Sequence, residues 1–194
     1  SPTTADDVLH DMNGRIAAVI DGGPCQIGLE STVVGIEGGE IVIYRPGGTT
    51  KEALSAIAPT TVDSALAKEG AHPKAPGMKY RHYAPSAPLT VYTGEAGKVA
   101  EEIFSFTGKC DKRYGFFVSE ETARLLPKGL PVFVWGHRED KESFAHNLFS
   151  GLLYFNRHPV DAIIGEGTDT AGLGLAIMNR LTKASGYHIV VEKR

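Results

Sequence analysis

Apolar residues in the second half of the chain follow two alternating patterns. Short runs rich in β-branched and aromatic residues are typical of buried strands, and stretches with apolar residues every three or four positions are typical of helices. The predicted strands are residues 89–92, 114–118, 131–135, 160–164 and 187–191, and the predicted helices are residues 97–106, 121–126, 141–155 and 173–184. This regular alternation predicts a Rossmann-like parallel α/β domain.

The helix 141–155 carries the strongest amphipathic signal in the sequence. It places one apolar face at helical spacing, formed by Phe144, Leu148, Leu152 and Phe155. Such a stripe indicates a helix that packs against the predicted sheet.

The first region of the chain is patterned differently. A capping signal at Thr4 predicts a helix that ends near Met12, and a capping box of Thr49 and Glu52 predicts a second helix. Between them, a two-residue glycine turn predicts a β-hairpin. The elements expected here are strands at 16–20, 30–36 and 40–45 and a helix at 51–57.

The stretch from Lys74 to Pro85, KAPGMKYRHYAP, has neither helical nor strand periodicity. Prolines stiffen it, and it combines cationic side chains with tyrosines, which are groups that bind phosphate and stack on bases. A proline-rich spacer and a functional loop are equally good interpretations of this composition.

Composition limits the functional classes. The 194 residues suit one large or two small domains, and the net charge of -3 gives no global field that would attract nucleic acid. Two distant cysteines form no disulfide framework and fit a reducing, cytoplasmic setting. The seven histidines show no metal-binding spacing, and we see no signal peptide and no apolar run long enough to span a membrane.

Two short motifs in the first region could carry chemistry. In Glu30-Ser31-Thr32, the hydroxyls could bind a carboxylate or phosphate, although local backbone satisfaction is the favoured interpretation of this motif alone. In Arg45-Pro46-Gly47-Gly48, a guanidinium at a strand end could bind phosphate, and an ordinary exposed arginine is equally plausible.

The glycine-rich segment 165–174 follows a predicted strand and precedes a helix, as a nucleotide-binding loop would. It lies near the end of the domain and lacks a third glycine in the GxG context, so close backbone packing is favoured over a bound cofactor. On the following helix, Asn179, Arg180 and Lys183 could face RNA or the first region, but a solvated helix face is favoured.

Six motifs in this order resemble the threonylcarbamoyl-AMP synthase family, the YrdC-like enzymes, in its longer two-domain form. The motifs are SPTTADDV (1–8), VIDGG (19–23), GLESTVV (28–34), IYRPGGTT (43–50), PGMKYRHYAP (76–85) and GLGLAIMNRLTKAS (172–185). The resemblance covers nearly the whole chain, and the combination is far more specific than any one motif.

The resemblance implies a domain division. Residues 1–68 would be the C-terminal portion of a YrdC-like α/β catalytic domain, residues 69–87 a proline-containing linker that acts as a lid, and residues 88–194 a Rossmann-like C-terminal accessory domain. In the family, an upstream half of the catalytic domain supplies a Lys/Arg pair and a Ser-x-Asn motif to the same cleft. We expect that half to precede Ser1.

The resemblance also implies an activity: L-threonine, bicarbonate and ATP would give threonylcarbamoyl-AMP and pyrophosphate, for threonylcarbamoyladenosine modification of tRNA. ATP would enter as a substrate with magnesium, without a tightly bound cofactor or covalent nucleophile. The product would pass to the tRNA threonylcarbamoyl transferase machinery in the cytoplasm. The alternative is an RNA- or tRNA-binding fragment, with a weak RNA contact through residues 68–81 and the C-terminal domain, or a regulatory fragment without catalysis of its own.

Site residues follow motif by motif from the same resemblance. Ser1, Arg45 and Tyr83 would bind ATP, and Ser31 would bind L-threonine. Thr3, Thr32, Arg81 and His82 would support them. No protein metal ligand is implied.

Overall fold

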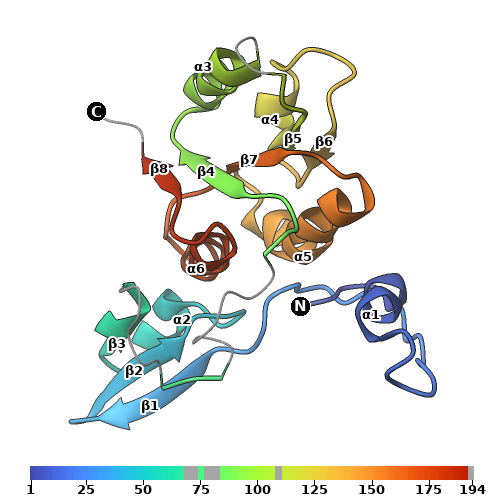
Figure 1. The fold of residues 1–194 in the computed structure, drawn as a ribbon. Coiled ribbons are helices and arrows are strands. Elements are labelled where there is room, and N and C mark those ends of the chain that lie inside the picture. The colour runs from blue at the N-terminus through green and yellow to red at the C-terminus, as the bar shows by residue number, and fades with distance from the viewer. Residues whose placement is uncertain (68–73, 77–83, 108–110, 192–194) are drawn as a thin grey trace.

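The computed structural model describes residues 1–67, 74–76, 84–107 and 111–191, which form two sheets with helices around them (Figure 1). The larger sheet lies in the second region, residues 84–191. It contains β4 (Leu89–Thr93), β5 (Tyr114–Val118), β6 (Val132–Val134), β7 (Ala162–Glu166) and β8 (Ile189–Val191). All its strands are parallel in the order β6-β5-β7-β4-β8, which confirms the predicted parallel α/β architecture.

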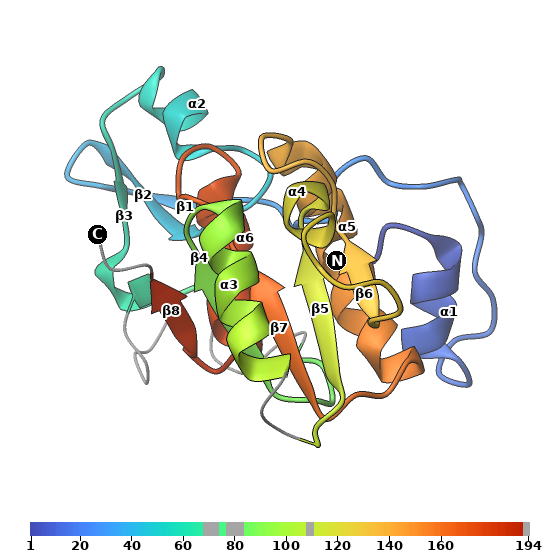
Figure 2. The ribbon, with the colours of Figure 1, turned by 90° about the horizontal axis from the view of Figure 1, so that it is seen from above.

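Helices cover both faces of this sheet (Figures 1 and 2). One face carries α3 (Ala96–Thr107) and α4 (Glu120–Ala123), and the other carries α5 (Lys141–Arg157) and α6 (Gly174–Ala184). Because both faces are covered, the strands β4 and β5 read as nearly continuous apolar runs. The five predicted strands and four predicted helices are all present, with ends shifted by up to three residues.

The apolar face predicted for α5 is the core of this region. Its four residues are at most 3% exposed, and Phe144 also stacks on Trp135 with ring centroids 3.8 Å apart. Burying these large side chains excludes water from the α5–sheet interface and contributes most of the hydrophobic stabilisation there.

The first region, residues 1–67, contains a smaller sheet of order β1-β2-β3. Its elements are α1 (Ala5–Met12), β1 (Val33–Glu37), β2 (Glu40–Arg45), α2 (Lys51–Ser55), β3 (Thr60–Val62) and a 3₁₀ turn (Ser64–Ala67). The predicted hairpin is β1–β2, and β3 pairs parallel to β2. The sequence did not indicate β3, because three residues after a proline are too short for a periodicity signal.

Two local predictions in this region are wrong. Residues 16–20 form no strand, and Ile20 is 96% exposed, because no described strand lies beside this segment to pair with its backbone. The N-cap of α2 is Thr50, whose hydroxyl accepts a hydrogen bond of 3.2 Å from the Ala53 N–H, and not Thr49. Thr49 instead bonds to Thr32.

The two regions meet along α5 and α6, which form the face of the larger sheet turned toward the first region (Figure 1). Gly28 packs directly on α5, since a β-carbon there would lie 2.5 Å from the Ala145 carbonyl oxygen. Asp7 of α1 accepts a hydrogen bond of 2.6 Å from the Ser150 hydroxyl of α5. Among the described residues, no helix is long and apolar enough to cross a membrane.

Candidate functional site

Arg45 and Ser31 lie together at the end of the β1–β2 hairpin. Strand pairing sets Val33 opposite Arg45, which brings the residues just before Val33 beside the guanidinium. Arg45 donates from Nε and Nη2 to the Ser31 carbonyl oxygen at 3.1 and 3.0 Å, and from Nη2 to the Ser31 hydroxyl at 3.1 Å. Two residues singled out separately in the sequence thus form one polar cluster.

The turn after Arg45 packs against the backbone of Glu30, Ser31 and Thr32. The Gly48 N–H donates to the Glu30 carbonyl oxygen at 3.2 Å. A β-carbon on Gly47 would lie 2.1 Å from that same oxygen, so only glycine allows this close approach. The glycines therefore set the distance between the serine segment and the arginine turn.

The remaining hydroxyls of the cluster have structural roles in this arrangement. Thr32 donates its hydroxyl to the Thr49 carbonyl oxygen at 2.6 Å and accepts from the Thr49 N–H at 3.1 Å. The Thr32 hydroxyl thus satisfies backbone groups, as favoured from sequence, but those of Thr49, 17 residues away, and not local ones. Thr3 is 2% exposed, and its methyl group lies against Gly28, which packs on α5, so the described contacts give Thr3 a packing role.

Arg180 of α6 crosses from the second region into this cluster. Its Nε and Nη2 donate to Glu30 Oε2 at 2.8 and 2.6 Å, and Nη2 also donates to the Pro46 carbonyl oxygen at 3.2 Å. Arg180 is 6% exposed and Lys183 7%, so the solvated helix face favoured for them is wrong, because both side chains are covered where the two regions meet. Ser1 lies beside the same carboxylate, with its backbone nitrogen 3.7 Å from Glu30 Oε1.

A cavity of about 470 Å³ opens next to the Arg45–Pro46 turn. It lies between the regions, and its polar lining includes Asp63, Asn179, Thr182 and Lys183. Burial, and to a smaller degree the neighbouring Arg180 charge, lower the pKa of the Lys183 ammonium from 10.5 to about 8. Lys183 therefore gives this cavity a cationic group that loses its proton at a lower pH than an ordinary lysine does.

The described part of the predicted lid touches the site. Arg45 Nη1 donates to the Pro76 carbonyl oxygen at 3.0 Å. Lys74 pairs with Glu37 at 2.6 Å and lies over the Tyr44 ring, and its bond to Glu37 lowers the pKa of that carboxyl. Tyr83, Arg81 and His82 lie outside the described residues, as do residues 68–73 and 77–80 of the predicted RNA contact.

The glycine-rich segment 165–174 is closely packed. A β-carbon on Gly174 would lie 2.0 Å from the Asp169 carbonyl oxygen, and one on Gly167 would lie 2.9 Å from the Met178 sulfur. This supports the packing interpretation. The Gly172 N–H donates to Glu52 Oε1 of α2 at 3.2 Å, which makes a second link between the regions.

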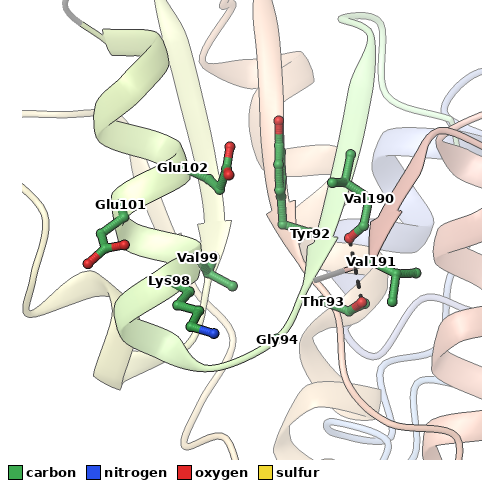
Figure 3. Close-up of a pocket in the computed structure, with 9 residues that line it drawn as sticks. All are labelled: Tyr92, Thr93, Gly94, Lys98, Val99, Glu101, Glu102, Val190 and Val191. Atoms are coloured by element: carbon green, nitrogen blue, oxygen red, sulfur yellow. Dashed lines mark hydrogen bonds between the residues drawn. The ribbon is translucent and has the colours of Figure 1, made fainter. Parts of the chain in front are cut away.

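Other cavities lie at the carboxyl ends of the strands of the larger sheet. One, of about 440 Å³, lies between α3, β4 and β8, and Figure 3 shows Tyr92 and Glu102 on its walls while Glu101 points away. Burial and the Glu102 charge raise the pKa of the Tyr92 phenol. An adjoining cavity of about 620 Å³ includes Glu95, Glu139 and Asp169 with Arg138 and Lys141. With three carboxylates against two basic groups, this cavity is poorly suited to a phosphate ligand.

The parallel sheet, the arginine–serine cluster and the inter-region contacts define an α/β protein with a polar cluster where its two regions meet. Throughout the described ranges, no group of three or more His, Cys, Asp or Glu side chains is placed to hold a metal ion.

A family model described as the threonylcarbamoyl-AMP synthase C-terminal domain matches residues 49–186, and one described as telomere recombination matches residues 1–47. The chain therefore belongs to the threonylcarbamoyl-AMP synthase family.

Curated relatives from three organisms are named threonylcarbamoyl-AMP synthase. The Bacillus subtilis protein is 42% identical over 98% of this chain and 55% of its own length. The Pyrococcus abyssi protein is 40% identical over 98% of this chain and 55% of its own length. The Schizosaccharomyces pombe protein is 36% identical over 95% of this chain and 49% of its own length. The chain thus spans about half the length of the relatives it matches.

Solved structures agree with these matches. The crystal structure of P. abyssi Sua5 complexed with L-threonine superposes with a TM-score of 0.84 at 39% identity, covering 100% of this chain and 56% of that one. A variant of that protein, in which a histidine and the tyrosine after it are replaced by alanine, matches with the same TM-score and identity over 99% and 55%.

Two features of the cluster were missed in the sequence, the Glu30 carboxylate and the Pro76 carbonyl group, and the alternative that Arg180 faces the first region was considered but not favoured. Glu30 and Arg180 are 150 residues apart, so no local pattern connects them. The only available signal was that each falls inside one of the family motifs.

Proposed function

We propose that the full-length protein containing residues 1–194 is an L-threonylcarbamoyladenylate synthase. L-Threonine, bicarbonate and ATP would give threonylcarbamoyl-AMP and pyrophosphate for threonylcarbamoyladenosine modification of tRNA. The observation that carries the proposal is the juxtaposition of Arg45 and Ser31, which unites the two motifs assigned to ATP and to L-threonine. Family membership and the relatives' names support it.

The cluster suits the charge changes of this reaction. When a threonylcarbamate oxygen attacks the α-phosphate, the bond to pyrophosphate breaks and negative charge grows on the phosphate oxygens. A guanidinium held beside them stabilises that charge. The Ser31 hydroxyl accepts from Arg45 and keeps its own hydrogen to donate to L-threonine. No covalent intermediate is required.

Magnesium enters this scheme with ATP as part of the substrate. The Glu30 carboxylate, the nearest acid to Ser31 in sequence, already accepts two hydrogen bonds from Arg180, so it is poorly suited to become a metal ligand. We therefore assign the metal to the phosphates.

We retain the proposed division into a catalytic portion (1–68), a lid (69–87) and an accessory domain (88–194), in which the catalytic portion is YrdC-like. The bond from Arg45 to Pro76 supports the lid, because it joins that segment to the phosphate site. His82–Tyr83 is the one place in the chain where tyrosine directly follows histidine, as in the pair replaced in the P. abyssi variant. Tyr83 would close over the nucleotide, supported by Arg81 and His82, and exclude water from the labile carbamate.

The test is an assay of the purified full-length protein with ATP, magnesium, bicarbonate and L-threonine. We expect threonylcarbamoyl-AMP by mass spectrometry and an equal amount of pyrophosphate, with both lost when any one substrate is left out. Transfer of the threonylcarbamoyl group to tRNA should require the added transferase machinery. Pyrophosphate release that does not depend on L-threonine would refute the proposal.

A further inference from the structure

Arg180 reaches from the second region into the candidate site. Its guanidinium makes two hydrogen bonds to Glu30 Oε2 and one to the Pro46 carbonyl oxygen, while Nη1 donates to its neighbour Asn179 at 2.9 Å. The side chain is 7% exposed and that of Glu30 17%. This is a largely buried, charge-assisted contact between α6 and the first region.

The groups that Arg180 holds flank the two proposed substrate-binding residues. Glu30 directly precedes Ser31, and Pro46 directly follows Arg45. The Arg180 guanidinium therefore bridges the serine segment and the arginine turn, which Arg45 also joins through its bonds to Ser31. A shift of Arg180 would change the spacing of both.

A buried ion pair of this kind is a weak explanation of stability, because desolvating both charges offsets much of their attraction. Its fixed fork geometry is better suited to setting distances and angles. The helix α6 that carries it is held rigidly, since Ala176, Ile177 and Leu181 are at most 1% exposed against the larger sheet. Through Arg180, the second region is thus joined to the loops that carry Ser31 and Arg45, whose spacing the proposed reaction requires.

We propose that Arg180 is a positioning residue for the Ser31–Arg45 site, so that the second region is a working part of the synthase active site. The inference rests on the proposed function. Arg180 touches no substrate in this scheme and acts through Glu30 and Pro46.

The experiment compares Arg180→Gln, Arg180→Lys and Glu30→Gln in the full-length protein. Misplacing reacting groups by about 1 Å costs on the order of 100-fold, so Arg180→Gln should lower kcat/KM for L-threonine by about that factor. Arg180→Lys should fall in between, because it keeps the charge without the fork. Glu30→Gln in the Arg180→Gln background should add little further loss.

A matched control is a contact between the regions that lies outside the Ser31–Arg45 cluster. Ser150→Ala and Arg157→Ala weaken the contacts of α5 with Asp7, away from Ser31 and Arg45. They should leave kcat and KM unchanged even where they lower Tm. If these controls lost as much kcat/KM as Arg180→Gln does, the positioning role would be wrong, and general destabilisation would explain the losses.

The charge left unpaired in Arg180→Gln could prevent folding, so the double variant Glu30→Gln/Arg180→Met removes both charges. We expect it to fold and still show the kinetic loss. Wild-type kcat and KM in this folded variant, or in Arg180→Gln, would refute the positioning role while leaving the proposed function intact. Failure of the unaltered protein to make threonylcarbamoyl-AMP would instead refute the proposed function and this inference with it.

Discussion

The carbonyl oxygen of Glu30 lies 2.1 Å from the position that a β-carbon on Gly47 would occupy. A side chain there would push two backbone segments apart, and both carry proposed substrate-binding residues. The glycine of the arginine turn is thus required by close approach and not by an unusual backbone angle.

Gly47→Ala should therefore reduce both stability and activity. Overpacking against backbone typically costs about 1–3 kcal/mol, and the displaced Ser31 should lower kcat/KM beyond the effect of lost folding. Urea unfolding and steady-state kinetics measure the two effects. Gly48→Ala is the control, because its β-carbon would meet only Ile27 side-chain atoms at an ordinary 3.5 Å. Equal effects of the two substitutions would contradict the close-contact explanation.

Arg45→Ala should lower kcat/KM by about 100- to 1,000-fold, the usual effect of removing one donor that stabilises developing charge. Tyr83→Ala should weaken ATP binding by about 1–3 kcal/mol, the range for a base–aromatic stack, and should cost less overall than Arg45→Ala. Calorimetric titration with ATP and magnesium gives the affinities. Arg124→Ala removes an exposed pair with Glu120 and should be neutral. Unchanged ATP affinity in Tyr83→Ala would rule out the lid role.

Much of the second region could be predicted from the sequence because its signals are local. Buried strands and the amphipathic α5 each have a periodicity that their own residues set, and a βα alternation leaves few topologies. The first region was harder. Residues 16–20 have the composition of a strand, but a strand also needs a neighbour to bond with, and composition carries no information about that neighbour.

The candidate site likewise has a part that could be predicted from the sequence and a part that could not. Ser31 and Arg45 could be singled out because their residue types and flanking turns are suggestive, and the hairpin between them brought them together. For Arg180 the sequence allowed a contact with the first region but favoured a solvated face, because a charged residue on an amphipathic helix is usually solvated. Only the tertiary arrangement, which brings α6 onto the first region, makes it part of the site.

Glu52 should stabilise the junction of the regions in a pH-dependent way. Its own backbone N–H and the Gly172 N–H lower the pKa of this carboxyl below its ordinary 4.5. The contribution is therefore complete above pH 4.5 and is lost as the pH falls through the lowered value. Glu52→Gln should cost a few tenths to about 1 kcal/mol at neutral pH, as for other charges near a helix N-terminus, and nothing in strong acid. A cost that is independent of pH would contradict this account.

Lys183 should give stability a dependence of the same sign, but in a higher pH range. Burial, aided by the Arg180 charge, lowers its pKa from 10.5 to about 8 in the folded protein. Below pH 8 both states carry the charge and folding bears the full penalty of burying it. Between pH 8 and 10.5 Lys183 loses its proton in the folded state but keeps it in the unfolded chain. The free energy of unfolding therefore increases with pH across this range.

The free energy of unfolding of the unaltered chain should therefore increase relative to that of Lys183→Met as the pH rises from 8 to 10.5. Urea titrations across this range measure the difference, and Lys51→Met on the exposed α2 is the matched control. The other contacts of Lys183 that the substitution removes change the free energy of unfolding by an amount that does not depend on pH. They therefore do not affect the slope of the difference against pH, which is the quantity compared. A flat difference would mean that the pKa of Lys183 in the folded protein stays near 10.5, and would contradict this account.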